Sequence, residues 1–336
     1  MQLEPREYSK RLGTLSHAQL QSALARFDLG ELFAAEPAPG GLFGQNVFLT
    51  SSRGEFVLRG CPHGEDQLPK ERFFARLLHE RACVPVPWPY RLEPSPEIFG
   101  WGFAIVPRLP GLCVGLPEVR KSLAPGELAN VAGALGAGLA ELHAAVWPYL
   151  GEYDLASDDI ARIELDYEEW VIARLRARLA ECRRASSATT EDDVAWVESI
   201  VARSRVALRG EFAPTFVHVD YTEGNALVER TGSGWRVSGV LDLMTGYFGD
   251  PEADLVRLLA HYARVDRVAA HRFLDAYQSR RPLRPGSADR LAFYALADSI
   301  TLWEYGQRNR VWFGDGMCLR DFAQRFVALD LGGVRR

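Results

Sequence analysis

Three oxygen-bearing side chains in the middle of the sequence have the types and the spacing that phosphoryl transfer requires. Asp220 lies five residues before Asn225, and Asp242 follows seventeen residues after Asn225. Phosphoryl transfer needs an aspartate that orients an attacking hydroxyl. It also needs oxygen ligands, such as an asparagine and a second aspartate, that hold magnesium ions. The sequence supplies these side chains in the order and at the spacing that kinases use.

The apolar residues around these three positions predict how they are held. Residues 216–217 precede the polar stretch, residues 226–228 follow it, and residues 235–241 lead into Asp242 after a Gly-rich turn. This pattern predicts a strand, a turn and a strand. Such a hairpin brings Asn225, just before its first strand, and Asp242, at the end of its second, to one edge. A hard cation can bridge two oxygen ligands there.

Each of these residues also has a structural interpretation. A single Asp or Asn in a Gly-rich turn usually bonds its own backbone, and a single His beside a strand is more often a buried, satisfied side chain than a catalyst. Order, spacing and flanking strands together favour a catalytic role for Asp220, Asn225 and Asp242. For His218 we keep the structural interpretation, in which the side chain braces the loop.

The chain resembles the aminoglycoside phosphotransferase and choline kinase superfamily, small-molecule relatives of the protein kinases. Residues 217–228 resemble its catalytic-loop stretch, usually written H-G-D-x-x-x-x-N, and residues 239–255 resemble its metal-aspartate segment with the trailing G-D-P-x-x-D-L. The resemblance implies that Asp220 is the catalytic base and that Asn225 and Asp242 are ligands of Mg²⁺. It implies an α+β, bilobal protein-kinase-like fold, with an N-terminal antiparallel-sheet lobe and a mainly helical C-terminal lobe.

The sequence departs from the family pattern at two positions. Val219 replaces the usual Gly, and Leu243 replaces the aromatic residue that commonly follows the metal aspartate. Neither change removes a polar catalytic atom, so they bear on loop geometry. Asp250 and Asp254 are predicted to have structural roles, with Asp254 in an ion pair or as a helix cap on residues 251–262.

The N-terminal part supports the same interpretation. A Gly-rich lead at residues 40–46, which includes Gly41, Gly44 and Asn46, precedes an alternating run at 47–50, a turn at 51–54 and a second run at 55–59. This pattern predicts a β-hairpin that folds over a nucleotide, because glycines let backbone N–H groups approach a phosphate. A P-loop sequence occurs nowhere, so a P-loop NTPase is excluded.

A kinase also needs a cation on the second strand and a helical Glu that orients it. No lysine lies on that strand, and Arg59 occupies the position. We therefore predict Arg59 as the phosphate cation and Glu71, on a helix at 67–80, as its partner. The alternative is a surface Glu71 that pairs with Arg72 or Arg76.

The strand at 101–106 is expected to end at the hinge between the lobes. In the resembled family, backbone groups at this hinge bind the adenine, and we place the hinge at 105–108, with Ile105 and Val106 as nucleotide-binding residues. The predicted lobes are therefore residues 1–106 and 107–336. Beyond the hinge, apolar spacing predicts helices at 127–146, 166–182, 190–206, 251–265, 269–279, 288–309 and 319–329.

Composition favours an ordinary globular enzyme. The 336 residues are 47% hydrophobic and 25% charged, with a net charge of −5, which gives no electrostatic reason to expect nucleic acid as a partner. Five cysteines without Cys-x-x-Cys spacing fit a reducing cytoplasm, and no signal peptide or membrane-length apolar run is visible. We expect a monomer or homodimer that uses ATP or GTP with Mg²⁺.

Three functions compete at this point. The first is a kinase acting on a hydroxyl of a small molecule. The second is a nucleotide-binding regulator with a kinase fold and no catalysis, and the third is a metal-dependent hydrolase, which lacks further ligands at metal-binding spacing. The segment between Asp242 and Asp254 is too short for the activation loop with which protein kinases dock peptide substrates.

The acceptor is predicted less sharply than the catalytic residues. The acidic residues of 158–169 would attract a cationic acceptor such as an aminoglycoside or an amino alcohol, although such a run is usually a solvated face. We place the acceptor near Trp303, Glu304, Tyr305 and 312–315, where aromatic faces and carboxylates suit an ammonium group. The alternative is that these aromatic residues are helix packing.

Overall fold

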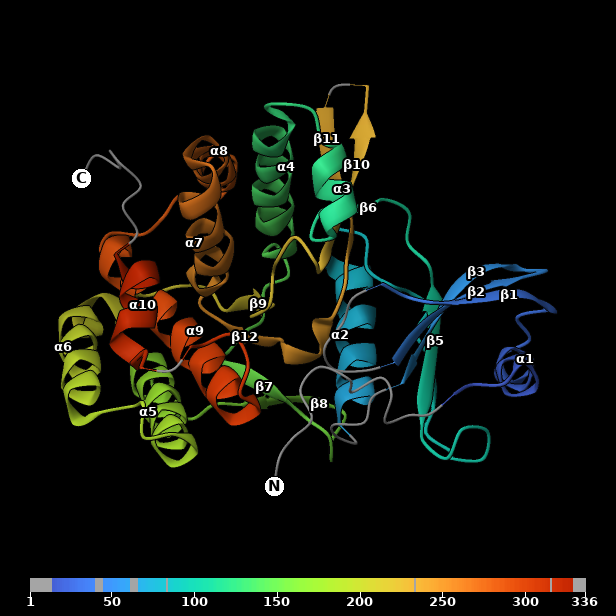
Figure 1. The fold of residues 1–336 in the computed structure, drawn as a ribbon, viewed down its shortest axis with the longest axis horizontal. Coiled ribbons are helices and arrows are strands. Elements are labelled where there is room, and N and C mark those ends of the chain that lie inside the picture. Colours follow the sequence, from blue (N-terminus) through green and yellow to red (C-terminus); the bar gives the residue numbers. More distant parts are fainter. Residues whose placement is uncertain are drawn as a thin grey trace.

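The computed structural model describes residues 14–39, 45–60, 66–82, 84–232, 234–314 and 316–328. A five-stranded antiparallel sheet, in the order β1-β2-β3-β5-β4, lies on the right of Figure 1. Its strands are β1 (Leu32–Pro37), β2 (Gln45–Ser51), β3 (Gly54–Gly60), β4 (Arg91–Glu93) and β5 (Phe103–Pro107). The predicted hairpin is confirmed as β2 and β3, and Asn46 lies opposite Arg59 in its register.

The alternation of side chains along β3 separates a core face from a cavity face. Phe56 and Leu58 point into an apolar cluster that α1 (His17–Arg26) covers. Successive side chains of a strand point to opposite faces, so Val57 and Arg59 face the other way, into a cavity. Helix α1, whose N-cap Ser16 forms a capping box with Gln19, has no counterpart among the predicted helices.

Two further sheets position the polar loops. One has the order β11-β10-β6, from β6 (Leu112–Cys113), β10 (Ala226–Thr231) and β11 (Gly234–Val240). The other has the order β8-β7-β12-β9, from β7 (Gly151–Asp154), β8 (Asp159–Arg162), β9 (Thr215–Val217) and β12 (Tyr247–Gly249). The chain crosses between these sheets twice, from β9 to β10 and from β11 to β12. Asp220 and Asn225 lie on the first crossing and Asp242 on the second, so the two polar segments are neighbours.

Helices make up most of the remaining chain and lie on the left of Figure 1, while α2 lies between them and the first sheet. The helices are α2 (Gln67–Arg81), α3 (Pro117–Ser122), α4 (Glu127–Leu142), α5 (Tyr167–Ala185), α6 (Glu191–Leu208), α7 (Leu255–Val265), α8 (Arg267–Gln278), α9 (Ser287–Asn309) and α10 (Leu319–Val327), with short 3₁₀ helices η2 (Leu243–Thr245) and η3 (Pro251–Asp254). The predicted α+β class, with a strand-rich front and a helix-rich back, is confirmed.

Two of the differences between predicted and observed helix boundaries have a clear physical cause. The helix predicted at 127–146 ends at Leu142, because the chain then turns and Val146 pairs with Thr215 at the edge of β9. The helix predicted at 251–265 opens with η3, whose first residue is Pro251. The first sheet ends at Pro107, and the lobe boundary between residues 106 and 107 stays a prediction. No helix in the described ranges is long and apolar enough to cross a membrane.

Candidate active site

The loop from His218 to Asn225 is fastened at its start by one buried carboxylate. Asp254 accepts the backbone N–H of His218 at 2.6 Å and that of Val219 at 2.7 Å, and it also lies 3.1 Å from Nε2 of His143. Its side chain makes no capping hydrogen bond to α7. Of the two roles predicted for Asp254, the helix cap is therefore wrong, and the carboxylate positions the loop instead.

His218 braces the same loop, as the structural interpretation predicted. Its Nδ1 accepts the backbone N–H of Asp220 at 3.2 Å, so its Nε2 carries the proton that is donated to the carbonyl of Leu241 at 2.8 Å. The carbonyl oxygen of His218 accepts the hydroxyl of Thr245 at 2.7 Å. One neutral imidazole thus connects the Asp220 segment with the segment before Asp242.

Val219 occupies a backbone conformation that favours glycine. Its φ is +72°, in the left-handed region, and its side chain is partly exposed. A non-glycine residue in a sparsely populated region costs on the order of 1–3 kcal/mol, and surrounding contacts must hold it there. The two hydrogen bonds to Asp254 supply such contacts. The Gly usual in the resembled family is therefore replaced without loss of the loop geometry.

The second half of the loop is held by Glu223. Its carboxylate accepts the hydroxyl of Tyr262 at 2.7 Å and pairs with Arg120, while its carbonyl accepts the backbone N–H of Gly115 at 2.9 Å. A Cβ at Gly115 would lie 2.8 Å from the Cα of Gly224, so the close approach of α3's lead to the loop requires glycine there. Both ends of the loop are thus fixed to the helical part of the molecule.

Both carboxylate oxygens of Asp220 have partners. The side-chain amide of Asn225 donates to Oδ2 and to the backbone carbonyl of Asp220, each at 2.9 Å, and Arg257 on α7 donates to Oδ1. Burial raises the pKa of Asp220, and the Arg257 guanidinium partly opposes that shift. A carboxylate with a raised pKa is a better proton acceptor, which is the property that a general base needs.

Asn225 and Asp242, the two predicted metal ligands, come together at the edge of the β10–β11 hairpin. The backbone N–H of Leu241 donates to the carbonyl of Asn225 at 2.8 Å, and both side chains line the same cavity. Two oxygen donors on one wall are a chemically suitable start for a magnesium site, because Mg²⁺ is usually held by one or two protein groups together with phosphates and water.

Arg59 and Glu71 form the predicted pair. Nη2 of Arg59 lies 3.1 Å from Oε2 of Glu71 and 3.2 Å from Oδ1 of Asp242. Glu71 is 2% exposed, and Tyr90 donates its hydroxyl to the Glu71 carboxylate at 2.8 Å. The alternative of a surface Glu71 is therefore wrong. Burial by itself lowers the pKa of Arg59, but Glu71, Tyr90 and Asp242 raise it, so the guanidinium stays charged.

Nε of Arg59 is buried and lacks a hydrogen-bond partner within the described part of the chain. A buried donor without a partner is costly, since it loses its water and gains no acceptor. An anionic oxygen entering the cavity would satisfy it. This orphaned donor supports Arg59 as a phosphate cation.

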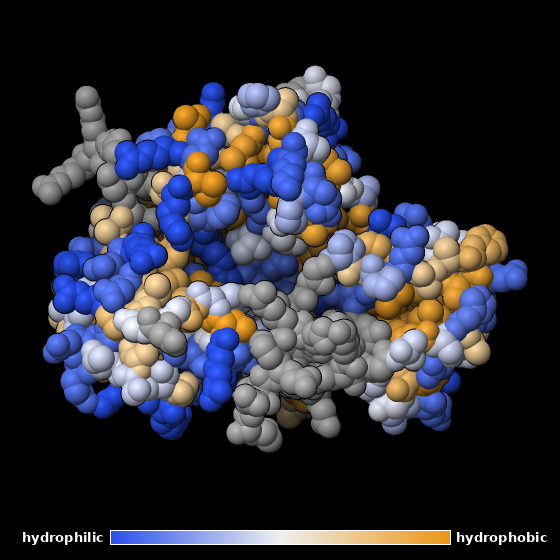
Figure 2. Space-filling view, in the orientation of Figure 1, coloured by the Kyte–Doolittle hydropathy of each residue, from blue (hydrophilic) through white to orange (hydrophobic). Residues whose placement is uncertain are grey.

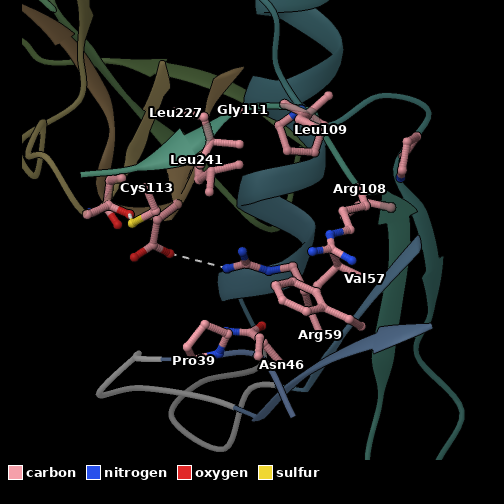
Figure 3. Close-up of a pocket in the computed structure, with 18 of the residues that line it drawn as sticks. Pro39, Asn46, Val57, Arg59, Arg108, Leu109, Gly111, Cys113, Leu227 and Leu241 are labelled. Atoms are coloured by element: carbon pink, nitrogen blue, oxygen red, sulfur yellow. Dashed lines mark hydrogen bonds and ion pairs between the residues drawn. The ribbon is translucent and has the colours of Figure 1, made fainter. Parts of the chain in front are cut away.

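The cavity itself has a volume of about 360 Å³, within the range of roughly 300–1,000 Å³ typical of small-molecule sites. Figure 3 shows Arg59 and Asn46 at one end and Leu109, Leu227 and Leu241 at the other, with a dashed line for the ion pair of Arg59 with Asp242. The apolar end suits a flat base, and the charged end suits phosphates. Figure 2 shows that this face of the molecule is hollowed near its centre, with hydrophilic side chains in the hollow.

The remaining predicted nucleotide residues are only partly at this cavity. Val106 and Asn46 line it. Ile105 does not, because its side chain points to the opposite face of β5 and packs in the cluster under α1. Gly41 and Gly44 lie outside the described residues.

Of the aromatic residues proposed for the acceptor, Trp303 belongs to the core, whereas Trp312 is 47% exposed and its ring centroid lies 5.0 Å from that of Tyr305. Trp303 is fully buried and donates Nε1 to Thr189 at 3.0 Å, and its ring packs against Phe313. Glu304 is 4% exposed and lies 3.0 Å from Arg308 and 3.5 Å from Arg178. Because these two arginines already neutralise Glu304, the structure favours the packing alternative over a cation pocket at this position. Residue 315 lies outside the described part of the chain.

The acidic run at 158–169 is at least partly a paired surface. Asp158 lies 3.2 Å from Arg72, and Glu168 pairs with Arg205 and Arg209. The side chain of Asp158 is partly exposed, as the solvated-face interpretation expects, whereas Glu168 is 5% exposed and is neutralised by its two arginines.

Two residues beside Asp220 were missed by the sequence analysis. Arg257 on α7 contacts both Asp220 and Asp298 of α9. A signal was available for Arg257, since it follows Asp254 by three residues and so shares a helical face with the residue that fastens the loop. No local pattern distinguishes Asp298 from other helical carboxylates.

Comparison with known proteins identifies the family of this chain. A family model described as "Phosphotransferase enzyme family" matches residues 34–289, which is most of the chain. The chain belongs to this family. This phosphotransferase is a small-molecule kinase with a hydroxyl as the acceptor group, and its phosphoryl donor is a nucleotide.

Curated relatives of this phosphotransferase include two homoserine kinases. That of Methylobacillus glycogenes is 28% identical over 80% of this chain and 78% of its own length. That of Burkholderia mallei is 26% identical over 86% of this chain and 85% of its own.

Solved structures share the fold at lower identity. An aminoglycoside phosphotransferase in a ternary complex with ADP and hygromycin B has a TM-score of 0.62, with 16% identity, over 93% of this chain and 98% of the other. A macrolide 2'-phosphotransferase from Brachybacterium faecium has a TM-score of 0.59, with 21% identity, over 94% and 99% of the two chains.

Proposed function

We propose that the protein transfers the γ-phosphate of ATP or GTP, with Mg²⁺, to the hydroxyl of a small molecule that carries an amine. The observation that carries this proposal is that Arg59, Asn225 and Asp242 line one cavity with an apolar end, and that Asp220 accepts a hydrogen bond from Asn225 beside it. We favour catalysis over a non-catalytic nucleotide-binding regulator, because such a regulator would usually have lost the base or a metal ligand, and Asp220, Asn225 and Asp242 are all present in the sequence. The lobes of the proposed enzyme are residues 1–106 and 107–336, and we propose a cytoplasmic monomer or homodimer.

The nucleotide base is proposed to lie between Val57 and Val106 on one side and Leu227 and Leu241 on the other, all of which line the cavity. The phosphates then extend toward Arg59, whose buried Nε offers a free donor. Glu71 orients Arg59. Asn46 is proposed to contact the phosphates from the side of β2.

Asn225 and Asp242 are the residues that would hold Mg²⁺. When bound, the ion supplies positive charge to the phosphate oxygens, which are its other natural ligands. Asp242 must exchange its contact with Arg59 for this role, and Arg59 keeps Glu71 as a partner when it does. The guanidinium therefore stays neutralised in either arrangement.

Asp220 is proposed to orient the acceptor hydroxyl and to accept its proton. The hydroxyl oxygen forms a bond to the γ-phosphorus, the bond from that phosphorus to the bridging oxygen breaks, and the nucleoside diphosphate leaves with the electron pair. Asn225 holds the Asp220 carboxylate in place through Oδ2. Burial of Asp220 raises its pKa and so strengthens it as a proton acceptor.

Homoserine is our leading candidate for the acceptor, because the curated relatives that cover most of this chain are named homoserine kinases. The aminoglycoside enzymes share the fold at identities too low to carry a substrate.

A coupled assay of nucleoside diphosphate release tests the proposal, with homoserine, choline, ethanolamine, an aminoglycoside and a sugar as acceptors and ATP or GTP as donors. We expect acceptor-dependent release with at least one amine-bearing alcohol, and no such release with Asp220→Ala. Nucleotide binding without any acceptor-dependent turnover across the panel would instead support the regulator.

A further inference from the structure

Arg257 and Asp298 form a charged pair directly beside Asp220. Nε of Arg257 lies 3.0 Å from Oδ1 of Asp298, Nη2 contacts the same oxygen, and Nη1 contacts Oδ1 of Asp220. The three side chains are 22%, 20% and 32% exposed, so each is reachable from solvent. The pair lies outside the lining of the nucleotide cavity, on the side of Asp220 that α7 and α9 form.

We infer that Arg257 and Asp298 are the acceptor site and that they recognise an α-amino acid with a short hydroxylated side chain, through its carboxylate and its ammonium group. This inference rests on the proposed function, since it assumes that Asp220 receives the acceptor hydroxyl. It adds the residues and the chemical class that the family assignment leaves open.

The occupied oxygens of Asp220 give the first argument. Asn225 donates to Oδ2 and Arg257 donates to Oδ1, so each oxygen keeps only part of its lone-pair capacity for an acceptor hydroxyl. The charged contact with Arg257 also weakens Asp220 as a proton acceptor. Asn225 is fixed by the loop and by Leu241, whereas Arg257 is a long side chain on a neighbouring helix. An acceptor that offers Arg257 a better partner releases Oδ1 for the hydroxyl.

The charges give the second argument. One guanidinium lies between the two carboxylates of Asp220 and Asp298. A carboxylate on the ligand can replace Asp220 as a partner of Arg257, because a planar guanidinium binds carboxylates in a fork geometry. Asp298 then shares the guanidinium of Arg257 with the ligand carboxylate. An ammonium group on the ligand supplies the positive charge that Asp298 has partly lost. A zwitterionic ligand thus gives Arg257 a carboxylate and Asp298 an ammonium group, so that every charge keeps a partner of opposite sign.

Neither simpler class of ligand achieves this. A plain amino alcohol can pair with Asp298 but leaves Arg257 on Asp220, and a hydroxy acid can draw Arg257 away but leaves Asp298 short of a cation. Since Nη1 of Arg257 touches Asp220, a zwitterionic head bound at the pair leaves a hydroxyl at the end of a short side chain within reach of the base. Homoserine has a carboxylate, an ammonium group and a hydroxyl at the end of a short side chain. It is also the substrate named for the curated relative from Methylobacillus glycogenes.

Wild-type protein tests the inference without any substitution. Homoserine is compared with 3-aminopropan-1-ol, which lacks the carboxylate, and with 4-hydroxybutyrate, which lacks the amine. We expect kcat/KM for each analogue to be at least about 10-fold to 100-fold lower, the effect of one lost charged hydrogen-bond partner. Equal kcat/KM for homoserine and 3-aminopropan-1-ol would overturn the inference and leave the proposed function standing.

Two variants then assign the ends of the ligand. Arg257→Gln is expected to raise KM for homoserine by about 10-fold to 100-fold and to abolish most of its advantage over 3-aminopropan-1-ol, while Asp298→Asn abolishes most of its advantage over 4-hydroxybutyrate. Arg257→Lys keeps the positive charge but cannot bind a carboxylate through two parallel hydrogen bonds. It is the second variant to measure if Arg257→Gln does not fold. Arg264→Gln, on the same helix but over the ring of Phe326, is the matched control and should leave all three acceptors unchanged.

The outcomes separate the two proposals. Equal losses for homoserine and 3-aminopropan-1-ol in Arg257→Gln would mean that Arg257 only positions Asp220, and would overturn the inference. Turnover with an aminoglycoside or a sugar, and none with homoserine, would also overturn the inference about the acceptor site. The proposed function as a small-molecule kinase would still stand. No turnover with any acceptor, despite nucleotide binding, would overturn the proposed function itself.

Discussion

The side-chain amide of Asn225 lies 2.9 Å from both the backbone carbonyl and the carboxylate of Asp220. The proposed metal ligand therefore holds the proposed base, and it does so with its nitrogen, which leaves its carbonyl oxygen for a cation. A single asparagine can serve both sites only because its amide has a donor end and an acceptor end. This is a physical reason for an asparagine, rather than an aspartate, at position 225.

The first prediction concerns the base. Asp220→Ala should reduce kcat by at least about 10²–10⁴-fold, the usual contribution of general-base catalysis. Nucleotide affinity and folding should stay nearly unchanged, because the loop is fastened through Asp254, Glu223 and His218. Steady-state kinetics and nucleotide titration calorimetry check this. Wild-type kcat in the variant would refute the role of Asp220.

The second prediction concerns the metal ligands. Asp242→Asn should weaken binding of Mg-ATP much more than binding of metal-free ATP, since the ion takes its remaining ligands from the phosphates. Calorimetric titrations with and without Mg²⁺ measure both affinities. Equal losses in the two titrations would mean that Asp242 acts only through its ion pair with Arg59.

The third prediction concerns Glu71. Glu71→Gln removes the buried partner of Arg59 and should lower the free energy of unfolding by about 3–5 kcal/mol, as expected when one member of a buried ion pair is removed. It should also weaken nucleotide binding, because Arg59 loses its orientation. Glu80→Gln, at an exposed position of the same helix, is the control for thermal unfolding and calorimetry. Equal unfolding free energies and equal nucleotide affinities for Glu71→Gln and Glu80→Gln would contradict the role of Glu71 in orienting Arg59.

The fourth prediction concerns pH. Burial lowers the pKa of His143, with Asp254 partly opposing the shift. Because the folded pKa lies below the unfolded value of about 6.5, the unfolded state binds more protons in this window. Stability should therefore fall as pH drops from about 6.5 toward the folded pKa of His143. His143→Gln should show a smaller loss of Tm between pH 8 and pH 5.5, and an unchanged pH dependence would exclude His143 as its source.

Sequence patterns predicted the parts of the site that are held by local structure. The hairpin that presents Arg59 and the hairpin that joins Asn225 to Asp242 both follow from alternation and turn residues. Glu71 followed from its place on a helical face. These features need only short-range information, and the comparisons with known proteins support the same fold.

The features that were missed depend on partners far apart in the sequence. Glu304 is neutralised in part by Arg178, 126 residues away, and no pattern near Glu304 indicates that partner. Strand β12 has three residues and is recognisable only through its pairing with β9 and β7. Arg257 and Asp298 read as ordinary helical charges until the fold places them beside Asp220.

Asp254, which fastens the loop, and Arg257, which contacts the base, lie three residues apart at the start of α7. A redesign that reshapes α7 to admit a different acceptor would therefore disturb the loop that carries Asp220 at the same time. Asp298 stands on α9 and is connected to the site through Arg257. Helix α9 is thus the place where acceptor preference can be altered while the chemistry is left alone.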